Sequence, residues 1–506
     1  MSVLQDRSRF ALYVGYGLLA LAYLALAWQQ LRYGIEFDEG FNLTVVRNMA
    51  SGLGYSTTGI VPWTWEVPFD PNASTGPTLL LPASLVWFLT GGSLEATRIV
   101  PFVFFLALVV ALGLLFYRVA GRWAALIAAG SPLLLSVAKE DISTVSLVPG
   151  RFVGEITATA CLVGMAVLLS SRRPLLAGLA GGMAIQAKLH FALPVVVTLG
   201  TWWLLERKFG RQVGGQALVR LGLGLTLPAI AFEAFRFASL GPGGYLPSIK
   251  NLGGWLLGQG ASAGYESMLD SAGRRLGGLL AVMSLLGALL LLTALATLVF
   301  NALTAGFGIH SAASSSEHPT GIIPLVALLT GTSVLFAWWM FYPPEKLPRV
   351  GTPILLILIP TLLVAAFVSL KRSSYSASRL GRFFGWVSAT VSGALGLLLV
   401  ITQMFTALNN DFGARLLTEQ RAASAVIRDS GTPSLPMEWI WNLAQFQILA
   451  DVPSQTNPDV DPPTVLVFDS IRARTDYGVD DARVFTQTCD QVLFESQAVV
   501  ICASDS

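Results

Sequence analysis

The sequence predicts a polytopic α-helical membrane protein with a small soluble α/β domain after its last span. Hydrophobic residues make up 54% and charged residues 12% of the 506 residues, whereas a typical soluble domain is about 25% charged. Apolar runs of about spanning length recur through residues 1–407. Residues 408–506 instead have a soluble composition and a net charge of −8, against +10 for the rest of the chain.

Eleven apolar runs are candidate membrane spans. The first follows MSVLQDRSRF and has no small-residue cleavage site after it, which favours an uncleaved anchor over a removed signal peptide. Two of the runs are short and closely joined, so the count stays open by one pair. The runs lie at about 10–29, 96–117, 122–138, 152–171, 174–187, 190–205, 217–237, 277–303, 321–341, 351–370 and 383–407.

The segment 77–91 is predicted to be an interfacial helix that does not cross the membrane. It is short for a span and contains Pro77 and Pro82. If it does not cross, the basic clusters all lie on the side of the N-terminus, as the positive-inside rule requires. If it crossed, most of them would move outside. The clusters are Arg7/Arg9, Arg118/Arg122, Arg172/Arg173, Arg207/Lys208/Arg211 and Lys371/Arg372/Arg379/Arg382.

This topology puts the N-terminus inside, the C-terminus outside and any chemistry on the outer face. The inner loops hold basic residues and the polar stretch 310–319, and little else. The outward segments are 30–95, 139–151, 188–190, 238–276, 343–349 and the domain 408–506.

The C-terminal domain is predicted to contain two helices and three strands. Helical periodicity covers 409–431, which ends at Gly431, and 437–452 is a second candidate helix. Cys489 and Cys502 both lie in this outward part, where a disulfide is permitted, and we expect them to pair. The strands are predicted at 464–470, 490–496 and 498–504, from their β-branched content and turn-like flanks.

The acidic pair Asp38–Glu39, directly after the first span, is the leading candidate for chemistry. One interpretation is a solvated helix end or an N-cap for the helix expected at 41–51. The alternative is a carboxylate that faces an outer cavity, where it acts as a general base on an acceptor hydroxyl or holds a metal ion at a departing phosphate.

Glu155 lies just inside the run 152–171, and an ionisable group at that depth is either functional or paired. Arg151, four residues earlier, is the nearest candidate partner in an (i, i+4) salt bridge. Lys139, Glu140 and Asp141, in the adjoining loop, have the pattern of solvated charges.

Two groups of basic residues are candidate phosphate ligands. Lys188 and His190 lie at a tight outer turn, where the lysine either binds a lipid phosphate or snorkels to the interface. Lys346 and Arg349 lie in a Pro-rich loop whose stiffness suits pyrophosphate or phosphate binding, with interfacial anchoring as the alternative.

Several other function classes are disfavoured. The three histidines show no HxxxH pattern and the cysteines no CxxC pattern, so no zinc site is indicated. No Lys/Arg-rich stripe with interleaved aromatics suggests nucleic acid. No glycine-rich phosphate loop lies between a strand and a helix, which argues against an ATP-driven pump.

The ordered motifs of residues 10–370 resemble the bacterial GT-C glycosyltransferases, similar to the lipid A aminoarabinose transferases and protein O-mannosyltransferases. The chain departs from the family where Gly76 replaces the Lys or His before Pro77, and where Val350 replaces the Tyr after Arg349. The matching positions are Asp38, Glu39, Phe41, Arg47, Asn48, Met49 and Gly52 in the first loop, then Pro77, Phe88–Gly91, Arg98, Glu155, Lys188, Pro194, Lys346–Pro348 and Pro353.

The resemblance implies an inverting transferase of the bacterial plasma membrane that uses a polyprenyl-phosphate sugar as donor. Asp38 would deprotonate the acceptor hydroxyl, Glu39 would orient Asp38 or share its role, and Glu155 would lie near the acceptor or position a divalent cation. The donor phosphate would be held by Lys188, Lys346 and Arg349, with Arg47, His190 and Asp141 in supporting or acceptor-binding roles.

The acceptor stays open between a lipid, a glycan and a protein. Two other classes compete with the transferase: a transporter of lipid-linked sugars, and a non-catalytic membrane scaffold. A transporter would require matched polar positions in two halves of the chain, and the sequence shows no such repeat.

Overall fold

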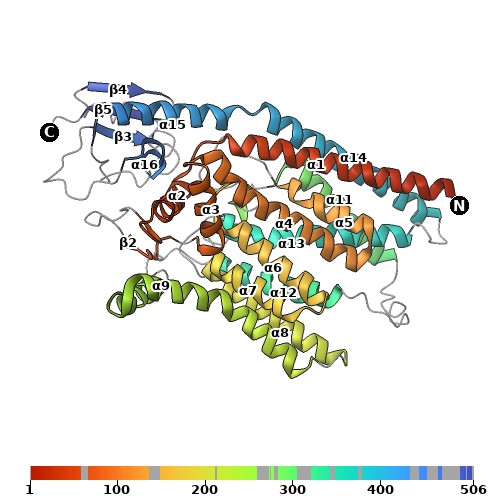
Figure 1. The fold of residues 1–506 in the computed structure, drawn as a ribbon. Coiled ribbons are helices and arrows are strands. Elements are labelled where there is room, and N and C mark those ends of the chain that lie inside the picture. The colour runs from red at the N-terminus through yellow and green to blue at the C-terminus, as the bar shows by residue number, and fades with distance from the viewer. Residues whose placement is uncertain are drawn as a thin grey trace.

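The computed structural model describes most of the chain as one helical bundle with a small sheet at one end. The described residues are 2–57, 67–73, 75–135, 149–210, 213–258, 273, 275–278, 283–304, 321–341, 348–373, 379–432, 444–452, 465–469, 491–496 and 499–503. In Figure 1 the strands β3, β4 and β5 lie at one end of the bundle, close to α2 and α3, and the N-terminus lies at the other. We call these the sheet end and the N-terminal end.

Each of the eleven apolar runs contains a helix. Within the described residues, seven helices are long and apolar enough to cross a membrane, while α6, α7 and α11 are apolar but shorter. The helices are α1 (Ser2–Leu31), α4 (Leu94–Ala120), α5 (Arg122–Gly130), α6 (Gly154–Ser170), α7 (Pro174–Ala187), α8 (Ala192–Lys208), α9 (Gly215–Gly258), α11 (Leu285–Thr304), α12 (Ile322–Phe341), α13 (Pro348–Ser373) and α14 (Arg379–Asn409).

Two predicted boundaries are wrong. The run 122–138 is helical only to Gly130 and continues as a short 3₁₀ helix, η1 (Ser131–Leu134), because Pro132 offers no N–H and its ring obstructs the preceding turn. The expected loop at 238–276 is helical to Gly258. Gly241 interrupts α9 with φ 63° and ψ 176°, and Pro242 then opens a second helical segment.

Between α1 and α4 lie the predicted helix after the acidic pair and the predicted interfacial helix. They are α2 (Phe37–Ala50) and α3 (Pro77–Leu89), the latter 13 residues long and therefore too short to span. The strands β1 (Ser56–Thr57) and β2 (Val67–Pro68) pair between them.

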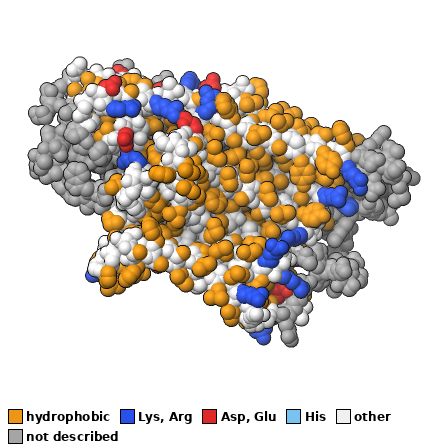
Figure 2. Space-filling view, viewed as in Figure 1, with side chains coloured by type: hydrophobic (Ala, Val, Ile, Leu, Met, Phe, Trp, Pro, Cys, Tyr) orange, Lys and Arg blue, Asp and Glu red, His pale blue; other side chains and the backbone are white. Residues whose placement is uncertain are grey.

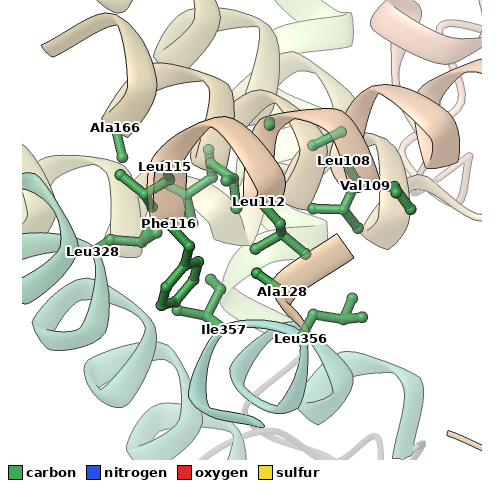
Figure 3. Close-up of a cluster of buried hydrophobic side chains, with 14 of the residues drawn as sticks. Leu108, Val109, Leu112, Leu115, Phe116, Ala128, Ala166, Leu328, Leu356 and Ile357 are labelled. Atoms are coloured by element: carbon green, nitrogen blue, oxygen red, sulfur yellow. The ribbon is translucent and has the colours of Figure 1, made fainter. Parts of the chain in front are cut away.

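The core of the bundle is aliphatic and is centred on α4. Leu112, Leu115 and Phe116 recur on one face of α4 at (i, i+3, i+4) spacing and are almost fully buried. Figure 3 shows them among Ala128 of α5, Ala166 of α6, Leu328 of α12 and Ile357 of α13. The outward surface is also apolar, as Figure 2 shows by the wide hydrophobic band between charged groups at the two ends. Such a surface is typical of a protein in lipid.

Glycines let α7 and α9 pack backbone to backbone. A Cβ at Gly178 would overlap the carbonyl oxygen of Leu221, and one at Gly224 would overlap that of Leu175. Small residues at such contacts are typical of membrane helix pairs.

We therefore expect Gly178→Ala to lower the free energy of unfolding by about 1–3 kcal/mol, the usual cost of overpacking. The control is Gly164→Ala in α6, where a Cβ meets nothing within 4 Å. That change should leave stability unaltered or raise it by up to about 1 kcal/mol through helix propensity. Thermal unfolding in detergent measures both variants, and equal melting temperatures would contradict the prediction.

The C-terminal elements follow the predicted order. They are α15 (Phe412–Asp429), α16 (Ala444–Ala450), β3 (Val465–Asp469), β4 (Gln491–Glu495) and β5 (Val499–Ala503). The three strands form an antiparallel sheet with β5 in the centre. Gly431 follows α15 with φ 67°, the left-handed conformation of a helix C-terminus. Cys502 is disulfide-bonded and Cys161 is free, while Cys489, the predicted partner, lies outside the described residues.

Candidate active site at the sheet end

The acidic pair lies in the first turn of α2, where the helix dipole stabilises negative charge. Glu36 occupies the N-cap position, and its side chain makes no capping hydrogen bond. Asp38 is partly exposed, whereas Glu39 is fully buried. The interpretation of the pair as an N-cap or a solvated helix end is therefore wrong for Glu39, and the two carboxylates lie in different environments.

Glu39 is held by Arg98 of α4 in a two-pronged ion pair. The Arg98 Nε and Nη2 donate to Oε1 and Oε2 of Glu39, each at 2.7 Å. Nη2 also donates to the carbonyl of Gly34 at 3.1 Å, and Nη1 to that of Tyr33. Arg98 is 1% exposed. Both oxygens of Glu39 accept from one cation, which suits a positioning role better than proton transfer.

The Glu39–Arg98 pairing is the site contact that sequence reasoning missed. Its signal was the isolated arginine that opens an apolar helix, because a charge at that place needs a partner.

Glu155 and Lys188 form a second buried ion pair. Lys188 Nζ lies 3.4 Å from Glu155 Oε1, and the two residues are 6% and 4% exposed. Gly154 makes room for the lysine, because a Cβ there would lie 2.8 Å from Lys188 Cγ. Lys188 therefore does not snorkel to the surface.

The alternative pairing of Glu155 with Arg151 is wrong. An (i, i+4) bridge needs continuous helix, but α6 begins only at Gly154, after an extended Val153. Arg151 instead pairs with Glu36 at 2.6 Å and lies over the ring of Tyr33.

Asn42 and the turn at Thr75–Gly76 bring these segments together. Asn42 Nδ2 donates to the carbonyl of Phe152 at 2.7 Å and to Thr75 Oγ1 at 3.2 Å. The Gly76 N–H donates to the carbonyl of Ala187 at 3.0 Å. Because Asn42 lies one helical turn after Asp38, the face of α2 that bears Asp38 is turned toward the start of α6. Asp38, Glu155 and Lys188 thus belong to one region at the sheet end.

An aromatic cluster closes the first loop onto α9, and it was also missed. The rings of Tyr55 and Phe69 stack at 5.5 Å, and Phe232 of α9 packs edge-on against both. Arg236 lies over Phe69 and Phe232. Burial raises the pKa of Tyr55, whose hydroxyl donates to the carbonyl of Thr75 at 3.2 Å.

The remaining predicted residues lie next to the Glu155–Lys188 pair, at the far end of α2, or outside the described residues. His190 stacks on Trp338 with ring centres 5.7 Å apart. Arg47, at the far end of α2, donates to the carbonyl of Gln447 and to Asp451, both at 3.2 Å, so it joins α2 to the C-terminal domain. Asp141 and Lys346 lie outside the described residues. Of Arg349 the structure describes only the backbone, in the first turn of α13.

Within the part of the chain that the structure describes, no three His, Cys, Asp or Glu side chains gather into a metal-binding group. A cation at Asp38 would therefore take its other ligands from substrate phosphate, water or residues outside the described ranges. Magnesium bound through one or two carboxylates and a phosphate has such a ligand set.

Comparison with known proteins gives a fold but no sequence family. No family model and no curated protein matches the chain. ArnT from Cupriavidus metallidurans in the apo state is similar with a TM-score of 0.54 and 14% identity, over 99% of this chain and 98% of that one. ArnT bound to undecaprenyl phosphate matches with a TM-score of 0.54 and 15% identity, over 98% of both chains. The predicted GT-C fold is thus confirmed.

Proposed function

We propose that the protein is a membrane glycosyltransferase that moves a sugar from a polyprenyl-phosphate donor to a lipid, glycan or protein acceptor. The observation that carries the proposal is the placement of the buried Glu155–Lys188 pair beside the face of α2 that bears Asp38. A base and a cation near one another are what this reaction requires. The ArnT structure with undecaprenyl phosphate supports a polyprenyl carrier, because it has the same fold.

In the proposed reaction Asp38 accepts the proton of the acceptor hydroxyl as its oxygen attacks the anomeric carbon. The bond from that carbon to the phosphate oxygen breaks on the opposite side, so the configuration inverts and the electron pair leaves with the lipid phosphate. Lys188 neutralises the phosphate, together with Lys346 and Arg349 as expected from the sequence. Since lipid phosphate is a stable leaving group, positioning and charge neutralisation supply much of the rate.

The roles of the other carboxylates follow from their contacts. The ion pair between Glu39 and Arg98 holds the first turn of α2 and so positions Asp38. Glu155 orients the Lys188 side chain before the donor binds. His190 and Arg47 support the site from neighbouring elements, and Asp141 is a candidate for acceptor binding. If a divalent cation assists the phosphate, chelation will abolish transfer and magnesium or manganese will restore it.

The proposed orientation is that of a bacterial plasma-membrane protein with the sheet end outside. The basic residues Arg118 and Arg172 lie at the N-terminal end, where Arg118 donates to the carbonyl of Val167 near the end of α6. Positive charge at that end favours the cytoplasmic side for it.

The test of the function is an assay of the purified full chain in vesicles, with radiolabelled polyprenyl-phosphate sugars and lipid, glycan and peptide acceptors. Transfer of label to an acceptor supports the proposal. Movement of intact donor across the vesicle membrane indicates a transporter of lipid-linked sugars. The absence of both transfer and movement indicates a scaffold. Each of the last two results would overturn the proposal.

Lys188 gives a prediction for the donor. Lys188→Gln removes a charged hydrogen bond worth about 1.5–3 kcal/mol, so we expect the donor KM to rise about 10–100-fold with a smaller change in kcat. The double variant Glu155→Gln/Lys188→Gln leaves no unpaired charge in the pocket and should fold, yet show the same rise.

The control is Lys208→Gln, an exposed lysine at the end of α8. It makes the same change of net charge and should leave the donor KM unaltered. A double variant with the donor KM of the wild type would contradict the assignment of Lys188.

A further inference from the structure

The segment that joins α1 to α2 is bound from two sides. On the bundle side, Arg98 donates hydrogen bonds to the carbonyls of Tyr33 and Gly34. On the other side, Gln420 of α15 meets Ile35, the next residue along. The direction of α2, and with it the position of Asp38, depends on this short segment.

Gln420 pairs with both backbone groups of Ile35. The Ile35 N–H donates to Gln420 Oε1 at 2.8 Å, and Gln420 Nε2 donates to the Ile35 carbonyl at 2.8 Å. Gln420 is 3% exposed. One side-chain amide thus satisfies both backbone groups of a residue 385 positions earlier in the sequence, as a neighbouring β-strand would. A buried pair of this kind is costly to break, because both backbone groups would lose their partners.

Close packing surrounds this pair. A Cβ at Gly413 of α15 would overlap the ring of Tyr33, and one at Gly34 would overlap the Leu416 side chain. Gly413, Leu416 and Gln420 lie on one buried face of α15 at (i, i+3, i+7) spacing. The glycines allow α15 to approach the segment 33–35 closely enough for the Gln420 amide to reach it.

The second C-terminal helix supports α2 itself. A Cβ at Gly40 would lie 2.7 Å from the backbone nitrogen of Gln445 in α16. Gly40 and Asp38 are two residues apart and therefore about 200° apart around the helix. So α16 covers the face of α2 opposite Asp38, while Asn42 holds the Asp38 face toward Phe152. The C-terminal domain contacts the chain three residues before Asp38 and again two residues after it.

We propose that Gln420 is a positioning residue for Asp38, and that the C-terminal domain is a structural part of the active site rather than a separate module. The inference rests on the proposed function for its catalytic consequence, but its structural part stands on the contacts alone. Gln420 acts through Ile35 and touches no substrate. It acts by fixing where α2 begins, and so by fixing the distance from the Asp38 carboxylate to the acceptor hydroxyl.

The main test is Gln420→Ala in the full chain. Because a displacement of about 1 Å at a reacting group can cost on the order of 100-fold in rate, we expect kcat to fall about 10–100-fold while the donor KM changes little. The matched control is Ile427→Ala, which opens a cavity in the same buried face of α15, seven residues beyond Gln420. A loss of kcat in Gln420→Ala no larger than in Ile427→Ala would overturn the inference.

The conservative variant Gln420→Glu adds a readout that a general loss of stability would not give. A neutral carboxyl group can accept from the Ile35 N–H and donate to the Ile35 carbonyl, whereas the ionised form faces that carbonyl with a negative charge. The kcat of Gln420→Glu should therefore be close to that of the wild type at low pH and fall as pH rises. A pH profile parallel to the wild type would count against positioning by Gln420.

Hydrogen exchange separates this inference from the proposed function. In Gln420→Ala the amides of residues 33–50 should exchange faster than in the wild type and in Ile427→Ala. If the wild-type chain transfers no sugar, the proposed function fails, and exchange still decides whether Gln420 fixes α2. Unchanged exchange in residues 33–50 would overturn the inference whatever the activity.

Discussion

Replacing Asp38 by Asn is expected to lower kcat for sugar transfer by about 10²–10⁴-fold, the usual contribution of a general base. Asn has nearly the same shape but cannot take the acceptor's proton. The proposed binding of donor phosphate involves Lys188 and not Asp38, so the donor KM should change little. Initial rates with saturating donor and varied acceptor measure the effect.

Two controls make the result specific. Asp38 is partly exposed, so Asp38→Asn should melt within a few degrees of the wild type, which shows that the fold is intact. Glu495→Gln, on the exposed strand β4, removes an equal charge and should keep full activity. An Asp38→Asn variant with a kcat near the wild-type value would remove Asp38 from the proposed mechanism.

The sequence was sufficient for those features that depend on local pattern. Apolar runs located the helices, and the acidic pair Asp38–Glu39 directly after the first run marked the start of α2. The three short segments predicted as strands are β3, β4 and β5, because β-branched content and turn-like flanks are local signals as well. The segment 77–91 was predicted not to cross the membrane from its length, its prolines and the placement of the basic clusters, and α3 is indeed too short to span.

Pairing between distant residues was not predictable, because one sequence does not show which charges meet in space. Arg151 was the candidate partner that the sequence offered for Glu155, yet its partner Lys188 lies in another segment. The contact between Gln420 and Ile35 joins two residues with no local pattern that links them. The helical continuation of α9 was missed because Gly241 and Pro242 are typical of a loop.

The second large effect is expected at Arg98, and it concerns stability. Arg98→Ala leaves the fully buried Glu39 carboxylate without its partner and also removes the donor to the carbonyl of Gly34. Loss of one member of a buried ion pair costs about 3–5 kcal/mol. Arg98→Lys should recover only part of this, because an ammonium group cannot supply the two parallel N–H bonds that Glu39 accepts.

The matched control is the pair Arg421–Glu95, which also joins two distant segments, at 2.5 Å, but is about half exposed. An exposed pair contributes about 0–1 kcal/mol, so Arg421→Ala should unfold close to the wild-type temperature while Arg98→Ala unfolds well below it. The double variant Arg98→Met/Glu39→Met removes both charges and should be more stable than Arg98→Ala, because no unpaired charge stays buried. If Arg98→Ala and Arg421→Ala have the same melting temperature, the Glu39–Arg98 pair does not hold α2 in place. The assignment of a positioning role to Glu39 and a catalytic role to Asp38 would then be wrong.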